Sequence, residues 1–264
     1  MIDYGIAGRV AIVTGGSRGI GRACAMALAE QGVDICLTAR RQNLLDETAK
    51  EIQDATGVQV LTVAADMSSD DDVKRMVQTT SDHFGHIDIL VNNAASFPYG
   101  SSLELSVDEW ISHFQIKAFG YLRCMFAAYP HMQRNHWGRI INIAGQAARE
   151  GGGSAGANNS AIINMTKGFA LDLAKDGITV NAVHPGGPAD SDREPMRLEY
   201  QARERGITVE QATAEAEKNI PPIGRRVVTA DAANLVLFLA SAQADAITGE
   251  TMAIDAGANR TVIY

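Results

Sequence analysis

The sequence has few cysteines, more acidic than basic residues, and no apolar run long enough to cross a membrane. Its three cysteines, Cys24, Cys36 and Cys124, lack the spacing of a metal site or a disulfide framework, so we expect buried free thiols and no bound metal. The net charge of -8 argues against nucleic acid or an anionic membrane as a partner. Because no export leader is visible, we expect a cytoplasmic protein.

Short apolar runs rich in β-forming residues alternate with helical stretches along the chain. They occupy residues 10–14, 33–39, 58–64, 87–92, 139–143, 178–183 and 251–255. Such alternation is typical of βαβ units, and near-continuous apolar strands predict a parallel sheet with helices on both faces. The sequence therefore predicts an α/β fold, a single Rossmann-like doubly wound domain that spans residues 1–264.

The first apolar run leads directly into a glycine-rich loop, Thr14-Gly15-Gly16-Ser17-Arg18-Gly19-Ile20-Gly21. Its glycines permit a tight turn, a close approach of the backbone to phosphate, and close packing of the helix that follows. The backbone N–H groups and the helix dipole at this junction suit a pyrophosphate. The residues expected to bind a dinucleotide here are Gly15, Ser17, Arg18, Gly19, Ile20 and Gly21.

The loop, together with Asn92-Asn93-Ala94 and Val183-His184-Pro185-Gly186, resembles the short-chain dehydrogenase/reductase family from end to end. The resemblance implies a nicotinamide cofactor and further contacts to it. These are Asp66 and the adjoining Met67 at the adenine, Asn93 and Ala94 beside the adenosine ribose, and Pro185 and Gly186 near the nicotinamide. For Asp66, a plain cap of the helix that follows is the alternative.

The end of the second strand decides which cofactor is preferred. An acidic residue there would accept from the 2′-hydroxyl of NAD and repel the 2′-phosphate of NADP. This strand ends instead in Thr38-Ala39-Arg40-Arg41. Arg18 and Arg40 can present guanidinium groups to a phosphate, so we expect NADP(H) to be favoured over NAD(H). The alternative is that Arg40 and Arg41 are solvated residues at a helix start.

Members of this family reduce carbonyls with a tyrosine that donates a proton, a lysine that lowers its pKa, a serine and an asparagine. Alignment places Lys117 at the asparagine, Gly145 at the serine, Ala155 at the tyrosine and Asn159 at the lysine. No tyrosine lies between Tyr129 and Tyr200, and no serine lies between Ser112 and Ser154. The sequence therefore predicts an atypical member that lacks the Ser-Tyr-Lys residues.

Polar residues near these positions are the candidates for catalysis. The catalytic candidates are Lys117, Asn159 and Gln146, and Arg149, Glu150 and Asn158 also line the expected cavity. Lys117 is the favoured substitute, because its ammonium could stabilise a developing alkoxide. We expect Tyr121 to pack in the core or an interface, His184 to be structural, and Lys167 to lie on the surface.

Residues 188–222 interrupt the alternation with a charged, helix-forming segment between Pro-Gly-Gly-Pro and Pro-Pro. The resemblance implies a helical flap over the substrate, and a solvated excursion without ligand contacts is the alternative. Residues 110–133 and 155–175 match the family's paired interface helices, which implies a homotetramer or dimer.

These observations favour an NADP(H)-binding oxidoreductase that acts on a small carbonyl or alcohol with a non-standard active site. Two alternatives stay open on the same fold. One is a non-redox lyase or isomerase that uses Lys117 or Glu150 as a base, and the other is a catalytically silent cofactor-binding protein. The fold alone does not separate them.

Overall fold

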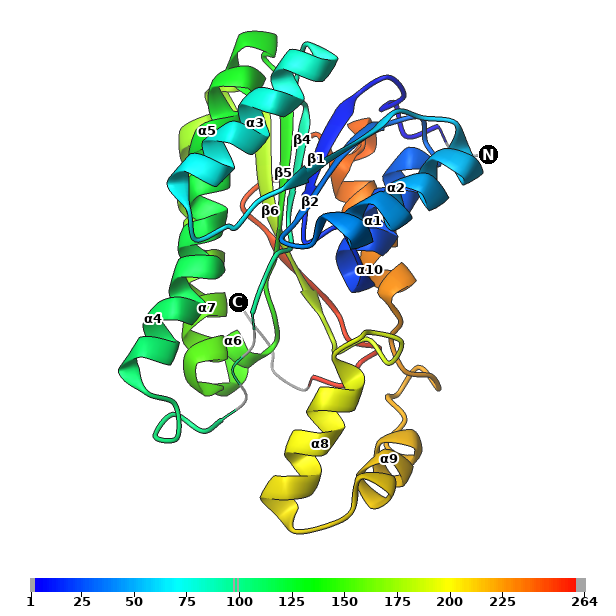
Figure 1. Cartoon of the computed structure of the whole chain (residues 1–264), viewed down its shortest axis with the longest axis vertical. Coiled ribbons are helices and arrows are strands. Elements are labelled where there is room, and N and C mark those ends of the chain that lie inside the picture. The colour runs from blue at the N-terminus through cyan, green and yellow to red at the C-terminus, as the bar shows by residue number, and fades with distance from the viewer. Residues whose placement is uncertain (1–2, 97, 99, 260–264) are drawn as a thin grey trace.

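A seven-stranded parallel sheet forms the centre of the computed structural model, which describes residues 3–96, 98 and 100–259 (Figure 1). The strands are β1 (Val10–Thr14), β2 (Asp34–Ala39), β3 (Val60–Ala64), β4 (Ile89–Asn92), β5 (Gly138–Ile143), β6 (Ile178–Pro185) and β7 (Thr251–Ile254). Their order is β3-β2-β1-β4-β5-β6-β7. Each strand overlaps a run that the sequence predicted. The strands β2, β3 and β4 begin one or two residues later than predicted, β5 begins one residue earlier, and β6 continues to Pro185.

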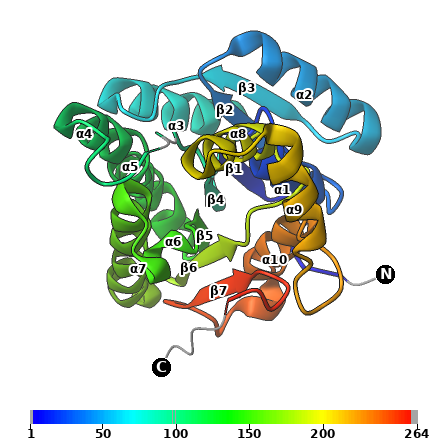
Figure 2. The same ribbon diagram turned by 90° about the horizontal axis from the view of Figure 1, so that it is seen from below.

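Helices cover both faces of the sheet, as predicted for a doubly wound fold (Figures 1 and 2). One face carries α1 (Gly19–Ala29), α2 (Gln42–Thr56) and α10 (Thr229–Ala240), and the other carries α3 (Asp70–Phe84), α5 (Ala118–Asn135) and α7 (Gly153–Leu173). The helices α4 (Val107–Ile116) and α6 (Ala147–Glu150) lie beyond the carboxyl ends of the strands on the α5 and α7 side. The two apolar cores on either side of the sheet contain the buried thiols of Cys24, Cys36 and Cys124, and burial raises the pKa of each to about 12.

A chain of buried hydrogen bonds fixes α5 and α7 against the middle strands. Asn92 of β4 donates to the side-chain oxygen of Asn142 on β5 (2.9 Å), and Asn142 donates to Thr166 Oγ1 on α7 (3.0 Å). Tyr121 of α5 donates its hydroxyl hydrogen to the carbonyl oxygen of Ile143 (3.0 Å), so it is a core residue. Because these bonds lie at the carboxyl ends of β4 and β5, they fix the positions of α5 and α7 at that edge of the sheet.

The segment after β6 contains α8 (Glu194–Arg205) and α9 (Val209–Lys218), which lie below the carboxyl ends of the strands in Figure 1. Its two ends are joined at the base. Ala189 N donates to the Val227 carbonyl oxygen (2.9 Å), and Asp190 accepts from the N–H and hydroxyl of Thr229 (2.7 and 2.8 Å). The base of the segment is thus anchored, and its role as a flap stays a prediction. Among the described residues, no helix is both long and apolar enough to span a bilayer.

Candidate functional site

The glycine loop between β1 and α1 is held by hydrogen bonds from the end of β4. Thr14 Oγ1 accepts from the backbone N–H groups of Asn93 (2.9 Å) and Ala94 (3.0 Å). The side-chain amide of Asn93 donates to the carbonyl oxygens of Thr14 (2.9 Å) and Gly15 (3.2 Å), which uses both of its hydrogens. Asn93 therefore fixes the loop, and its amide N–H groups are not left for a ligand.

The glycine loop is tightly packed at Gly15 and Gly21 and is open at Gly19. Gly15 has φ +66°, and a Cβ at Gly21 would lie 2.3 Å from the Gly15 carbonyl oxygen, so neither position accepts a side chain. A Cβ at Gly19 would meet nothing within 4 Å, and the side chain of Ile20 packs against the core. The first N–H groups of α1 lack intrahelical acceptors, and the space beside Gly19 is open. This arrangement fits a dinucleotide pyrophosphate.

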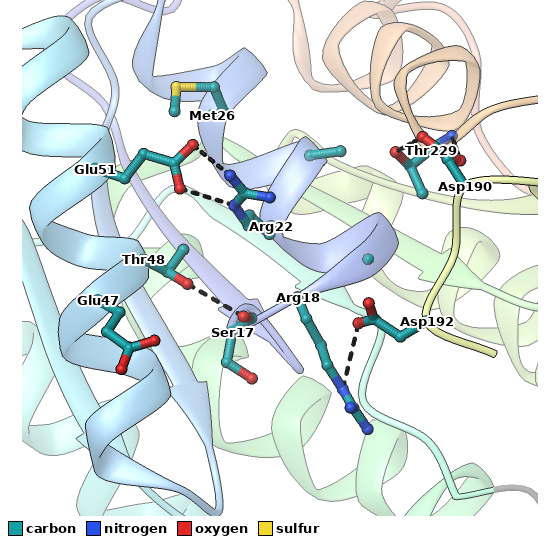
Figure 3. Close-up of a pocket in the computed structure, with 12 residues that line it drawn as sticks. Ser17, Arg18, Arg22, Met26, Glu47, Thr48, Glu51, Asp190, Asp192 and Thr229 are labelled. Carbon is teal, nitrogen blue, oxygen red and sulfur yellow. Dashed lines mark hydrogen bonds and ion pairs between the residues drawn. The ribbon is translucent and has the colours of Figure 1, made fainter.

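Two side chains of the loop, Ser17 and Arg18, border a cavity of about 470 Å³ along the outer side of α1 (Figure 3). Arg18 Nε lies 3.5 Å from Asp192 Oδ2 in the segment that leads to α8, while Arg22 is paired with Glu51. The Arg18–Asp192 pair is largely exposed, so it contributes little stability, and Arg18 can exchange this partner for another anion.

The residue that follows β2 is an exposed, unpaired arginine. Within residues 3–96, 98 and 100–259, the guanidinium of Arg40 makes no ion pair or hydrogen bond. The strand before it is fixed by Thr38, whose buried hydroxyl donates to the Val63 carbonyl oxygen (2.8 Å). A positive charge without a protein partner therefore stands at the position that decides between the two nicotinamide cofactors.

Asp66 does not cap the helix that follows it. Ser69 is the N-cap of α3 and accepts from Asp72 N (3.2 Å), whereas Asp66 Oδ1 accepts from the N–H and hydroxyl of Ser68 (2.8 and 2.7 Å). Asp66 Oδ2 has no partner in the described part of the chain, so it can accept from a ligand amine. The side chain of Met67 is buried, which leaves only its backbone for such a contact.

Pro185 and Gly186 stand at the carboxyl end of β6, where the backbone passes close to the residue after β7. Gly186 N donates to the Ile254 carbonyl oxygen (2.7 Å), and a Cβ at Gly186 would lie 2.8 Å from Asp255 Cα. Only glycine fits this crossing. On the same loop edge, Gln146 Nε2 donates to Asp255 Oδ2 (3.0 Å), so this catalytic candidate joins two loops. The side chains of Arg149 and Glu150 lie outside the described part of the structure.

Lys117 is placed by a break between two helices. It separates α4 from α5 with φ −97° and ψ −75°, and the first N–H of α5, that of Ala118, is bound by Asn158 Oδ1 on α7 (3.2 Å). The amide nitrogen of Asn158 donates to the Ser154 carbonyl oxygen (3.2 Å). Asn158 is therefore a positioning residue that holds the break against α7.

The break brings three of the aligned positions together. Lys117 Nζ donates to Asn159 Oδ1 at 2.6 Å, and both residues are 2% exposed. A Cβ at Gly145, after β5, would lie 2.7 Å from Asn159 Nδ2. Thr166, which bonds the sheet, lies two helical turns after Asn159 and on the same face of α7. Anchoring α7 through Thr166 thereby turns Asn159 toward the strand ends.

Burial makes Lys117 unusually acidic. Desolvation, and then the charge of Arg193, lower the pKa of Lys117 from 10.5 to about 7. Arg193 is the N-cap of α8, so a positive charge from the segment after β6 reaches the same place. A lysine with a pKa near neutrality can give and take protons at physiological pH.

The sequence analysis missed a buried pair beside Lys117. His113 Nδ1 lies 3.0 Å from Ser154 Oγ, and desolvation, followed by the charges of Lys117 and Arg193, lowers the pKa of His113 to about 4. His113 is therefore neutral at pH 7. His113 lies one helical turn before Lys117, and this spacing could have predicted that the two side chains are neighbours.

Comparison with known proteins identifies the fold family. A family model described as enoyl-(acyl carrier protein) reductase matches residues 15–259. The chain belongs to the short-chain dehydrogenase/reductase family. It is 33% identical over 250 residues to the 3-oxoacyl-[acyl-carrier-protein] reductase FabG of Staphylococcus aureus, which covers 94% of this chain and 96% of the relative.

Two further proteins match this chain over nearly their full length. The (2S)-[(R)-hydroxy(phenyl)methyl]succinyl-CoA dehydrogenase subunit BbsD of Thauera aromatica is 32% identical over 255 residues, 96% of this chain and 97% of that protein. The structure of L-sorbose reductase from Gluconobacter frateurii, complexed with NADPH and L-sorbose, superposes with a TM-score of 0.91 at 28% identity, covering 99% and 100% of the two chains.

Two residues that were expected to lie outside the chemistry are placed as follows. His184 is fully buried at the end of β6. Lys167 is exposed, and its Nζ lies 3.7 Å from Glu250 Oε1. Lys167 is thereby engaged away from the Lys117–Asn159 pair.

We expect Lys117 to destabilise the protein below pH 7. Its folded pKa of about 7 lies below its ordinary 10.5, so the unfolded chain binds more protons between these values and stability rises with pH across that window. At about 1.4 kcal/mol per pKa unit, the cost at pH 6 reaches several kcal/mol. Lys117→Met should raise the melting temperature at pH 6 and flatten its rise toward pH 9.

Lys167→Met is the matched control, because this lysine is exposed and should leave the profile unchanged. Differential scanning calorimetry at pH 6, 7.5 and 9 measures all three proteins. Parallel profiles for wild type and Lys117→Met would contradict the lowered pKa.

Proposed function

We propose that the protein is an NADP(H)-linked reductase of a small carbonyl compound, or the reverse alcohol dehydrogenase, with an atypical catalytic site. One observation carries the proposal. The buried ammonium of Lys117 donates a hydrogen bond to Asn159 at the carboxyl ends of the strands, where the glycine loop also lies. The S. aureus relative is by name a 3-oxoacyl-[acyl-carrier-protein] reductase, and the G. frateurii structure holds NADPH and a sugar. Both support a carbonyl substrate.

The charges around the loop support NADPH over NADH. A 2′-phosphate would meet Arg40, which has no other anion to neutralise in the described structure, and Arg18, whose bond to Asp192 is weak. No carboxylate follows β2 to select the 2′-hydroxyl. Asp66 Oδ2 would accept from the adenine amine.

We expect tighter binding of NADPH than of NADH, measured by calorimetry. Arg40→Ala should weaken NADPH about 10-fold or more, since it removes a charge-assisted contact, and should leave NADH nearly unchanged. Asp192→Asn should tighten NADPH by up to about 5-fold, because it frees Arg18. Equal affinities of the wild type for both cofactors would contradict the assignment.

Lys117 takes the place of the missing tyrosine in this proposal. When bound, the nicotinamide of NADPH supplies a hydride to the carbonyl carbon. The protonated Lys117 stabilises negative charge on the carbonyl oxygen and donates the proton, a role for which a pKa near 7 is suited. Gly145 and Ala155 carry no group that could do so. Gln146 is a weaker candidate because Asp255 holds its amide.

Reduction of ethyl acetoacetate by NADPH, followed by absorbance, tests this role. Because Lys117 must be protonated, kcat/KM should fall as pH rises through about 7. Lys117→Met should lower it about 100-fold or more, the range of general-acid catalysis, and Lys167→Met should leave it unchanged. Activity that Lys117→Met does not alter would contradict the proposal.

Two other outcomes would favour the alternatives. Substrate conversion without oxidation of NADPH would indicate a non-redox lyase or isomerase that uses Lys117 or Glu150 as a base. Tight NADPH binding without conversion of any carbonyl would indicate a silent cofactor-binding protein.

In this proposal the whole chain acts as one NAD(P)-binding domain. Residues 188–222 cover the substrate, since the charge of Arg193, in this segment, acts on Lys117.

The protein assembles as a homotetramer or dimer through α5 and α7. Phe126 is 63% exposed and stacks edge-on with Phe169 (5.7 Å between ring centroids), and Leu171 is 73% exposed. Large apolar side chains that are exposed on neighbouring helices, here α5 and α7, are typical of a subunit interface.

Light scattering at micromolar concentration should give a mass of at least twice 28.1 kDa. Phe126→Asp combined with Leu171→Asp should shift it toward the monomer, because two charges would be buried at the interface. Leu103→Asp is the control and should not change the mass, because Leu103 is 98% exposed and lies on a loop outside both helices. A monomeric wild type would contradict the assembly.

A further inference from the structure

The side-chain amide of Asn159 is occupied at one end only. Its oxygen accepts from Lys117 Nζ at 2.6 Å, but its nitrogen donates to no residue in the described structure. The residue is nevertheless 2% exposed. This nitrogen is not one of the fully buried side-chain atoms that lack a hydrogen-bond partner, so it keeps a small accessible surface. An unused donor at such a surface can bind a ligand.

Lys117 determines which end of the amide is unused. If the amide were rotated by 180°, its NH₂ group would face the ammonium, and two donors would oppose each other. The 2.6 Å contact therefore fixes the oxygen toward Lys117 and the nitrogen toward Gly145. This orientation follows from charge.

Gly145 packs closely against the amide nitrogen. A Cβ at this position would lie 2.7 Å from Asn159 Nδ2, closer than real Cβ contacts allow. Gly145 has no positive φ, so its backbone would accept alanine, and space alone distinguishes glycine here. The absence of a side chain therefore lets the amide lie against the backbone at the end of β5.

We propose that Asn159 Nδ2 donates a hydrogen bond to the reacting oxygen of the substrate, beside Gly145, and that Lys117 orients this donor. The proposal rests on the reductase function proposed above and adds the group that holds the substrate oxygen. Lys117, at the break between α4 and α5, and Asn159 of α7 then provide two donors to this oxygen. In the aligned family members a serine holds this oxygen, and Gly145 has no side chain for it.

Asn159→Asp separates this role from simple support of Lys117. Aspartate keeps an acceptor for the ammonium but removes the N–H donor. At pH 6 Lys117 is protonated in both proteins, because aspartate can only raise its pKa further above the wild-type value of about 7. If Asn159 only supports Lys117, Asn159→Asp will retain activity at this pH. If it binds the substrate oxygen, kcat/KM for ethyl acetoacetate should fall about 100-fold, as when one oxyanion donor is removed.

Gly145→Ala tests the position of this donor. Its methyl group would push Nδ2 aside, so kcat/KM should fall, whereas Gly168→Ala is the control. Gly168 lies on α7, where a Cβ would meet nothing within 4 Å. Calorimetry should give wild-type NADPH affinity for all three variants, which excludes misfolding.

A binding measurement avoids any dependence on turnover. The complex with NADP⁺ has no hydride to transfer, so calorimetric titration with ethyl acetoacetate measures ketone affinity alone. Asn159→Asp and Gly145→Ala should weaken it about 2- to 10-fold, the value of one hydrogen bond. Wild-type ketone affinity and wild-type kcat/KM in both variants would overturn the role of Asn159 and leave the reductase standing. A wild type that binds neither NADPH nor the ketone would contradict the proposed function itself, and this inference with it.

Discussion

The pairing of β1 with β4 is the constraint on which the rest of the structure depends. The chain builds the sheet outward from β1 through β2 and β3, then returns to add β4 on the opposite side of β1. At this reversal the loops after neighbouring strands diverge to opposite faces and leave a crevice. Thr14 at the end of β1 can then bind Asn93 after β4, which holds the glycine loop.

The second half of the site depends on a charge placed between helices. On our alignment, the family's asparagine position holds Lys117, and its lysine position holds Asn159. The ammonium and the amide have thus exchanged helices on this alignment, and in this chain they meet at 2.6 Å. The fold tolerates the exchange because the two groups face each other across the same gap. Burial costs stability while Lys117 is charged, and the same burial moves its pKa into the range useful for proton transfer.

Sequence patterns identified the strands and the loop because these depend on local periodicity. They were less informative about what each polar side chain touches. Asn158 was expected to line the cavity but binds the N–H of Ala118, and the alternative role of Asp66 as a helix cap is wrong because Ser69 occupies it. The pair of His113 with Ser154 was not foreseen. Each of these contacts joins residues whose orientation depends on how two elements pack.

The sequence by itself determined the seven strands, the glycine loop, the absence of an acid after β2, and the absence of tyrosine between Tyr129 and Tyr200 and of serine between Ser112 and Ser154. These are properties of residue identity and spacing, which exist before folding. Only the tertiary structure decided that Lys117 and Asn159, 42 positions apart, lie 2.6 Å from each other, and that the amide of Asn159 faces Gly145. Packing decided both contacts. Thr166 anchors α7 and Asn158 holds the break before α5, and together they set the direction and burial of the two side chains.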